Sequence, residues 1–185
     1  MDKIYTASKI WHNKVWRSLN VSSQYQIISN WINFDCGTKE NPSGAKDLNT
    51  VEKINLWKMC IEDVQRCDLL IAYAEKGETH RGALVEIGAA LSMGKPVYLI
   101  GNCKSFKEND NTSAIFTYHP LFNFVEHIVG GFNISGYKKE FKGFTVTKEK
   151  RLLDEYTYIP TASNSDSITF DDLFLLCIKH SKRKD

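Results

Sequence analysis

The amino-acid sequence predicts an α/β fold: a doubly wound, five-stranded parallel sheet with helices on both faces and a C-terminal insertion. Two short apolar runs, residues 69–74 and 96–100, do not alternate between polar and apolar positions, which is typical of strands buried on both faces. Between such runs lie segments whose apolar residues recur at helical spacing. Strands that alternate with helices along a chain form parallel sheets with right-handed crossovers. Flavodoxin-like and Rossmann-like folds have this organisation.

The individual elements follow in order from local patterns. The expected strands are residues 3–8, 25–29, 69–74, 96–101 and 121–125, the second of which ends near Trp31. The expected helices are residues 13–19, 50–66, 82–93 and 170–180. Thr50 and Thr169 are the expected capping residues of the second and the last helix. Polar and glycine-containing segments at 33–49, 75–82 and 102–120 are expected to be loops.

The pattern changes near residue 129, which predicts three parts. Residues 1–128 form the α/β domain. Residues 129–168 hold several glycines and end in a Ser-, Thr- and Asn-rich run, so they are expected to be an insertion with a hairpin or a linker. Residues 169–185 form a helix that packs on the same domain.

Composition narrows the class of protein. The chain has 185 residues, of which 42% are hydrophobic and 25% charged, and a net charge of +2. This charge favours neither nucleic acid nor an acidic partner. No apolar run approaches the roughly 20 residues that cross a bilayer, so we expect no membrane partner and a cytoplasmic protein. The five scattered cysteines suit reduced, buried thiols.

Glu86 is the leading candidate for a reactive group. It is the charged residue of the apolar segment 82–93, near the start of the expected helix. Leu84, Ile87, Gly88 and Leu91 share one helical face, so we expect them to pack on the sheet, with the glycines allowing close approach, and Glu86 to project away. Backbone N–H groups at a helix start favour an ionised carboxylate. The alternative is a solvated glutamate that only complements the helix dipole.

Three loops at carboxyl ends of strands, residues 5–11, 31–35 and 75–82, should converge at one edge of the sheet. Ser8 and Lys9 carry donors suited to a phosphate or a sugar hydroxyl. Trp11 or Trp31 offers a face on which a base could stack, although either could instead belong to the core.

Charged residues beside the expected helices add further candidates. His80 and Arg81 precede the helix that carries Glu86, and Arg81 could clamp an anion there or be a solvated loop residue. Glu62 and Asp63 lie late in the helix of residues 50–66, where anions are disfavoured, which makes both of interest. Alternatively, Arg66 offsets the charge of either Glu62 or Asp63 on a solvated face.

Several familiar motifs are missing from the sequence. It holds no Gly-x-Gly-x-x-Gly, no phosphate-binding Gly-x-x-x-x-Gly-Lys-Ser/Thr and no Gly-x-Ser-x-Gly. Its histidines lack zinc-ligand spacing. We therefore expect no cofactor and no metal.

The chain resembles the nucleoside 2-deoxyribosyltransferase superfamily, and more closely a branch of small bacterial and phage proteins. The longest matching segment runs from residue 82 to residue 97. The other matches are residues 3–8 with Trp16 and Arg17, residues 28–32, and Trp57 with Cys60 and Asp63. Together they span about residues 3–101.

The resemblance implies a role for several residues. It makes Glu86 the nucleophile on the anomeric carbon, Tyr5 the residue that orients this carboxylate, and Asp63 the nearest counterpart of the acid that protonates the leaving base. The sequence departs from the family at Cys60, eight residues before Asp68, and at His80, six before Glu86, where the family has aspartates. The expected substrate-binding residues are Ser8, Lys9, Trp11, Trp31, His80, Arg81 and Gly82.

The implied activity is cleavage or transfer of an N-glycosidic bond on a deoxynucleoside or its 5′-monophosphate. Whether a base or water completes the reaction, as in a transferase or a hydrolase, stays open. The resemblance also implies a homo-oligomer that binds a small-molecule nucleoside or nucleotide. Two alternatives are an NAD glycohydrolase-like enzyme and a nucleotide-binding sensor that has lost catalysis.

Overall fold

The structure, a computed structural model, describes residues 1–20, 23–34, 48–74, 78–101 and 119–127, and the C-terminal segment 170–182. It also describes short strand segments at 141–142, 144–147, 149–150, 155–156 and 167–168. Most of the expected loops 33–49 and 102–120, and the capping residue Thr169, lie outside the described residues.

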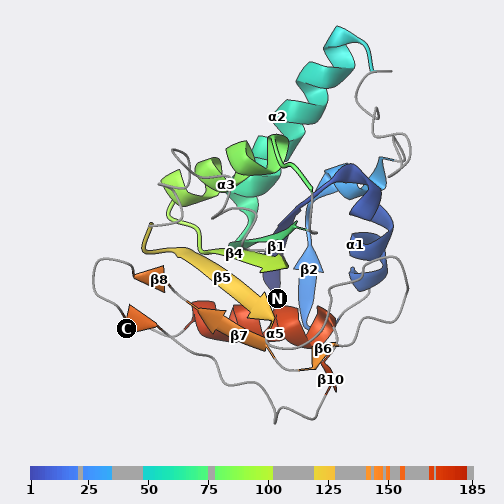
Figure 1. Cartoon of the computed structure of the whole chain (residues 1–185). Helices are drawn as coiled ribbons and strands as arrows, with labels where there is room; N and C mark the ends of the chain where they lie inside the picture. Colours follow the sequence, from blue (N-terminus) through green and yellow to red (C-terminus); the bar gives the residue numbers. More distant parts are fainter. Residues whose placement is uncertain are drawn as a thin grey trace.

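The centre of the fold is a sheet in the order β2-β1-β3-β4-β5-β7 (Figure 1). Its strands are β1 (Asp2–Ala7), β2 (Tyr25–Ile27), β3 (Leu69–Ala74), β4 (Val97–Gly101), β5 (Phe122–His127) and β7 (Phe144–Thr147). The first five pair in parallel, which confirms the predicted five-stranded parallel sheet. β7 adds an antiparallel strand beside β5. The order of the parallel strands reverses between β1 and β3, where doubly wound sheets bind their ligands.

Helices cover both faces of this sheet, as predicted. They are α1 (Asn13–Leu19), α2 (Thr50–Arg66), α3 (Gly82–Ser92) and α5 (Phe170–Ser181), with short 3₁₀ turns η1 (Ile10–His12) and η2 (Asn30–Asn33). Figure 1 shows α2 and α3 together on one side of the sheet and α5 on the opposite side. Among the described residues, none of the helices combines the length and the apolar character that a bilayer crossing needs.

Within the expected insertion, the structure describes four further strand segments, which form two pairs. β6 (Phe141–Lys142) pairs antiparallel with β10 (Ser167–Ile168). β8 (Glu149–Lys150) pairs antiparallel with β9 (Glu155–Tyr156). The predicted domain boundaries at 128 and 168 stay predictions.

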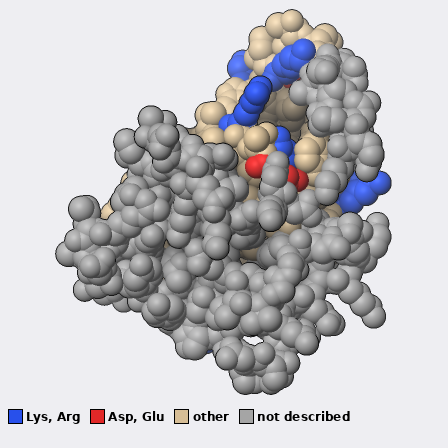
Figure 2. Space-filling view, in the orientation of Figure 1, with Lys and Arg blue, Asp and Glu red and all other residues tan. Residues whose placement is uncertain are grey.

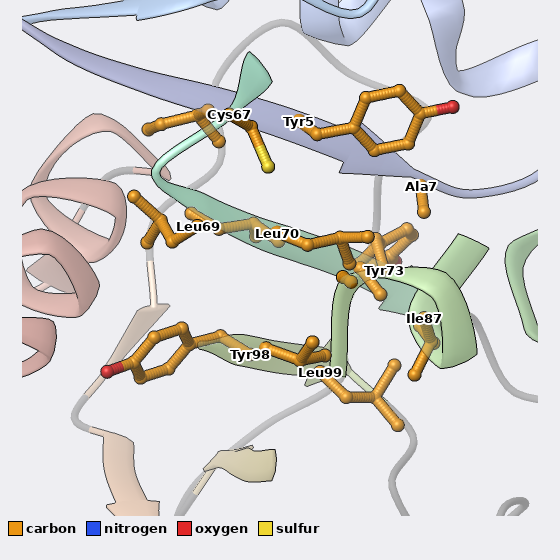
Figure 3. Close-up of a cluster of buried hydrophobic side chains, with 14 of the residues drawn as sticks. Tyr5, Ala7, Cys67, Leu69, Leu70, Tyr73, Ile87, Tyr98 and Leu99 are labelled. Carbon is orange, nitrogen blue, oxygen red and sulfur yellow. The ribbon is translucent and has the colours of Figure 1, made fainter. Parts of the chain in front are cut away.

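The hydrophobic core lies between the central strands and the helices on each face. All six residues of β3 are buried, as expected for a strand covered on both sides. Figure 3 shows Leu69, Leu70 and Tyr73 following one another along β3, with Tyr98 and Leu99 of β4 below them. In the same view the Tyr5 ring of β1 extends toward the carboxyl end of its strand, past Ala7. The core therefore places a tyrosine hydroxyl toward the carboxyl edge of the sheet.

Aromatic contacts join α5 to the first half of the chain. Phe174 of α5 is fully buried, and its ring centroid lies 5.7 Å from that of Trp16 and 5.5 Å from that of Tyr25. The Tyr98 hydroxyl lies 2.7 Å from Nδ1 of His180. The last helix thus packs on the sheet although almost the whole chain separates it from β1 and α1.

Two local predictions are corrected by side-chain hydrogen bonds. β2 ends at Ile27 rather than near Trp31. The Asp63 carboxylate accepts hydrogen bonds from the backbone N–H (2.8 Å) and the side-chain amide (3.1 Å) of Asn30, and η2 begins at that residue. The capping residue of α2 is Asn49 instead of Thr50. Asn49 and Glu52 form a reciprocal capping box, in which each side chain accepts the other's backbone N–H.

Replacing Phe174 with Ala should lower the free energy of unfolding by about 3–5 kcal/mol, because the change leaves a cavity between Trp16 and Tyr25. Urea unfolding followed by tryptophan fluorescence measures the change. Lys179→Ala, an exposed position on the same helix, is the control and should alter stability by less than about 0.5 kcal/mol. Equal, small effects of both variants would show that α5 contributes little to the core.

Candidate active site

The site forms where the strand order reverses, at the carboxyl ends of β1 and β3. The chain leaves β1 through residues 8–12, which include η1, and it enters α3 through residues 78–81. Figure 2 shows a few Asp or Glu atoms close to Lys or Arg atoms, with further Lys and Arg atoms over α2. Charges of both signs therefore share this face.

Tyr5 of β1 and Glu86 of α3 are in direct contact. The Tyr5 hydroxyl donates a hydrogen bond of 2.8 Å to Oε1 of Glu86. Tyr5 is fully buried, and Glu86 is 8% exposed. The two residues predicted from the sequence as nucleophile and orienting group are thus in direct contact, and they come from β1 and α3.

The packing face of α3 differs from the one predicted. The buried residues are Ala83, Glu86, Ile87, Ala90 and Leu91. Gly88 is exposed, and added Cβ atoms at Gly82 and Gly88 would meet nothing within 4 Å, so these glycines allow no close approach. The prediction failed because the segment is apolar on nearly every side, so that its periodicity could not decide which face packs. Glu86 consequently lies within the buried face.

Burial, rather than the helix dipole, dominates the ionisation of Glu86. It raises the pKa of Glu86 from 4.5 to about 7, while hydrogen bonds from Tyr5 and Cys60 lower it in part. The expectation that the carboxylate stays fully ionised is therefore wrong at neutral pH. Glu86 is the fifth residue of α3, beyond the first turn where the dipole acts most strongly.

The donors around Glu86 hold their own protons firmly. Burial and the neighbouring Glu86 raise the pKa of Tyr5 well above its usual value. Burial, with the charge of Glu86, raises the pKa of Cys60 to about 12. Both groups are therefore hydrogen-bond donors across the physiological range, and the Cys60 thiol brings α2 into the site as a third element.

Asp63 lies one turn beyond Cys60 on α2, is fully buried and is engaged elsewhere. Besides its two hydrogen bonds from Asn30, it accepts one from the Arg66 guanidinium. These contacts fasten η2 to α2. The predicted role of Asp63 as leaving-group acid has no supporting contact with the Tyr5–Glu86 pair among the described residues, and it stays a prediction.

A second buried carboxylate, Glu78, contacts residues of the segment after β1 and of the segment before α3. Its Oε1 accepts a 2.9 Å hydrogen bond from Nε1 of Trp11 and lies 2.8 Å from Nε2 of His12. Its Oε2 lies 3.8 Å from Nε2 of His80. The side chains of Glu78, His12 and His80 are at most 6% exposed.

The electrostatics of this cluster favour a neutral His80. Burial lowers the pKa of His80 to about 4, against the raising effect of Glu78, and Lys9 and His12 lower it further. Sequence reasoning missed Glu78, since nothing in the polar loop 75–82 distinguishes one acid from another. The contacts that identify Glu78 are long-range, because Trp11 lies 67 positions and His12 lies 66 positions before it in the sequence.

The other predicted binding residues fall into two groups. Ser8 accepts a hydrogen bond from Nε1 of Trp16 (2.8 Å) and donates one to the backbone carbonyl of Lys9. The Nζ atom of Lys9 lies 5.5 Å from the centroid of the Trp11 ring. These residues lie in the loop after β1, and Arg81 and Gly82 are exposed at the start of α3. Trp31, by contrast, is 7% exposed and donates Nε1–H to the carbonyl of Thr6. It therefore belongs to the core, which is the alternative to a stacking role given above.

A separate cavity of about 390 Å³ lies at the β2 edge of the sheet. Lys3, Gln26, Asn30 and Arg66 are among its lining residues, and neither Tyr5 nor Glu86 is. None of the predicted site residues lines it, and the contact between Tyr5 and Glu86 lies apart from it.

Comparison with known proteins gives similarity to solved structures alone. No family model and no curated protein sequence matches the chain. One similar structure is a 2-deoxyribosyltransferase from Bacillus psychrosaccharolyticus, with 19% identity and a TM-score of 0.42 over 53% of this chain and 71% of that one. Another is a CMP N-glycosidase from Clostridium botulinum, with 17% identity and a TM-score of 0.43 over 73% of this chain and 93% of that one.

A 2-deoxyribosyltransferase thus occurs among the similar structures, as the resemblance seen in the sequence predicts. Both TM-scores lie below 0.5. Neither structure therefore assigns an activity or a site residue to this chain.

Replacing Glu86 with Gln should make stability less sensitive to pH. Because folding raises the Glu86 pKa from 4.5 to about 7, this group's stabilising contribution is complete below pH 4.5 and is lost as the pH rises through about 7. Relative to wild type, E86Q should therefore gain up to about 3 kcal/mol between pH 4 and pH 8 in urea unfolding. Glu62→Gln, an exposed glutamate on α2, should show no such gain, and an equal gain in both variants would contradict the buried ionisation of Glu86.

Proposed function

We propose that the protein cleaves or transfers the N-glycosidic bond of a deoxynucleoside or its 5′-monophosphate, with Glu86 as nucleophile. The observation that supports this most is the buried Glu86 carboxylate held by the Tyr5 hydroxyl at the reversal point of the sheet. A carboxylate with a pKa of about 7 is available both as a nucleophile and as a leaving group near neutral pH.

The first step replaces the bond to the base by a bond to the enzyme. An oxygen of ionised Glu86 attacks C1′ while the C1′–N bond breaks, and the electron pair of that bond leaves with the base. The negative charge of the carboxylate stabilises the oxocarbenium-like transition state and then forms an ester with the sugar. Tyr5 fixes the orientation of the carboxylate through Oε1.

The second step frees the carboxylate. A second base or a water molecule attacks C1′, the ester bond breaks, and Glu86 recovers its charge. Attack by a base makes the enzyme a transferase, and attack by water makes it a hydrolase. In either case the sugar keeps its configuration, because two displacements occur at the same carbon.

The loop after β1 and the start of α3 are suited to hold the rest of the substrate. Ser8 and Lys9 supply a hydroxyl and a positive charge beside the Trp11 ring. Arg81 and Gly82 supply a guanidinium and a backbone N–H at the start of α3. A 5′-phosphate is the substrate group that matches these donors.

One observation favours a second candidate, a nucleotide-binding sensor without catalysis. Cys60 occupies the α2 position beside Tyr5 and Glu86, and a thiol with a pKa of about 12 is a poor acid at neutral pH. A sensor would bind deoxynucleotides in calorimetry without releasing base, and Glu86→Gln would leave its affinity unchanged.

Glu86→Gln should lower base release or base exchange by about 10³-fold or more, because an amide cannot form the ester. The purified protein is incubated with deoxynucleosides and their monophosphates, with and without an acceptor base, and free base is quantified by chromatography. Glu62→Gln, the matched exposed change, should retain wild-type rates. If E86Q and wild type turned over a substrate equally well, Glu86 would not be the nucleophile.

Tyr5→Phe should move the acidic limb of the kcat/KM profile to higher pH. The hydroxyl lowers the Glu86 pKa, so its loss raises that pKa further above 7 and leaves less carboxylate at a given pH. The rate should therefore fall more at pH 6 than at pH 9. Tyr98→Phe removes a buried hydroxyl bonded to His180 instead. An acidic limb displaced in the Tyr98 variant, or left in place in the Tyr5 variant, would contradict the assignment.

A further inference from the structure

We propose that Glu78, paired with His12, is the acid that gives a proton to the departing base. This inference rests on the proposed N-glycosidic function and adds to it the proton donor that the sequence failed to identify. Three observations carry it: the contacts of Glu78, the place of its cluster in the fold, and the engagement of the acids on α2.

The contacts show a carboxylate fixed by groups from the opposite loop. Trp11 and His12 follow β1, whereas Glu78 follows β3. Oε1 of Glu78 meets both the indole N–H and the imidazole Nε2, at 2.9 Å and 2.8 Å. A carboxylate in contact with an imidazole is an arrangement through which a proton can be passed in general acid–base catalysis.

The cluster lies at the same edge of the sheet as the nucleophile. The His12 ring meets the Tyr73 ring edge-on, with centroids 5.1 Å apart, and Tyr73 is the penultimate residue of β3. Figure 3 places Tyr73 at the end of β3 toward which the Tyr5 side chain also extends. β1 and β3 are paired neighbours in the sheet. A nucleoside bound between their carboxyl ends would therefore face both carboxylates.

The acids on α2 are poorly suited to the same task. The Arg66 guanidinium and the two donors of Asn30 already bind the carboxylate oxygens of Asp63. The Cys60 thiol keeps its proton. Glu78 is the remaining buried carboxylate that the described residues place at this crevice.

The proton balance closes with this pair. As the C1′–N bond breaks, its electron pair goes to the base, and a proton passes from the Glu78–His12 pair to the base. When water or a second base then attacks C1′, its proton returns to the pair and Glu86 leaves as a carboxylate. No oxidant, metal or cofactor is needed, and the pair ends in its starting state.

The test compares substrates whose bases do and do not need a proton. 2′-Deoxyguanosine is paired with its 7-methyl derivative, and 2′-deoxyuridine with its 5-nitro derivative. In each pair the second base departs without protonation. Glu78→Gln should slow base release from the first member by about 10²- to 10⁴-fold and from the second by less than about 5-fold. His12→Gln keeps a donor for Glu78 but carries no titrating proton, so it should give the same selective loss.

Two comparison variants separate this role from a structural one. Trp11→Phe removes one donor to Glu78 and keeps the acid, so it should slow both members of a pair equally. Asp63→Asn tests the acid predicted from the sequence and should also act equally on both. Circular dichroism checks the fold of each variant, and His12→Gln decides the matter if Glu78→Gln does not fold.

Three outcomes would contradict the proposed role of Glu78. Equal losses on both members in the Glu78 and His12 variants would show that the cluster only joins the two loops, and the proposal would be overturned while Glu86 kept its role. A selective loss confined to Asp63→Asn would assign the acid to Asp63 and overturn it as well. If wild type released base from no substrate, the N-glycosidic function and the proposed acid would both fall.

Discussion

The hydrogen bond between Tyr5 and Glu86 is the interaction on which the rest of the site depends. Removing a carboxylate from water costs several kcal/mol unless donors replace the solvent. Here the donors come from β1 and α2, while the acid comes from α3. The site therefore exists only when these three elements are packed together, and the parallel pairing of β1 with β3 is what brings them into register.

The described residues place two buried carboxylates, Glu86 and Glu78, in unlike surroundings. Glu86 has a tyrosine hydroxyl and a thiol as neighbours, whereas Glu78 has an indole and two imidazoles. Pairs of acids whose environments differ in this way can divide the roles of nucleophile and proton donor between them. A buried ionisable group also lowers stability at neutral pH, which is a cost that functional sites commonly carry.

Much of the fold could be predicted from the sequence. Residues 69–74 are apolar without alternation, and they form a strand buried on both faces. The helix of residues 50–66 and the parallel order of the strands followed from spacing and alternation in the same way. These features depend on neighbours in sequence. The end of β2 could not be predicted, since the Asp63 bond that starts η2 spans 33 residues.

The candidate site was predicted only in part. Glu86 and Tyr5 were identified from a lone charge in an apolar segment and from a resemblance, and they are in contact. The sequence by itself determined which residue types the crevice could hold and which strands would place them there. Only the tertiary structure decided that Glu86 is buried rather than projecting, that Asp63 is bound to Asn30 and Arg66, and that Glu78 meets His12. The physical reason is that ionisation and hydrogen bonding depend on desolvation and on partners distant in the chain, neither of which a local pattern contains.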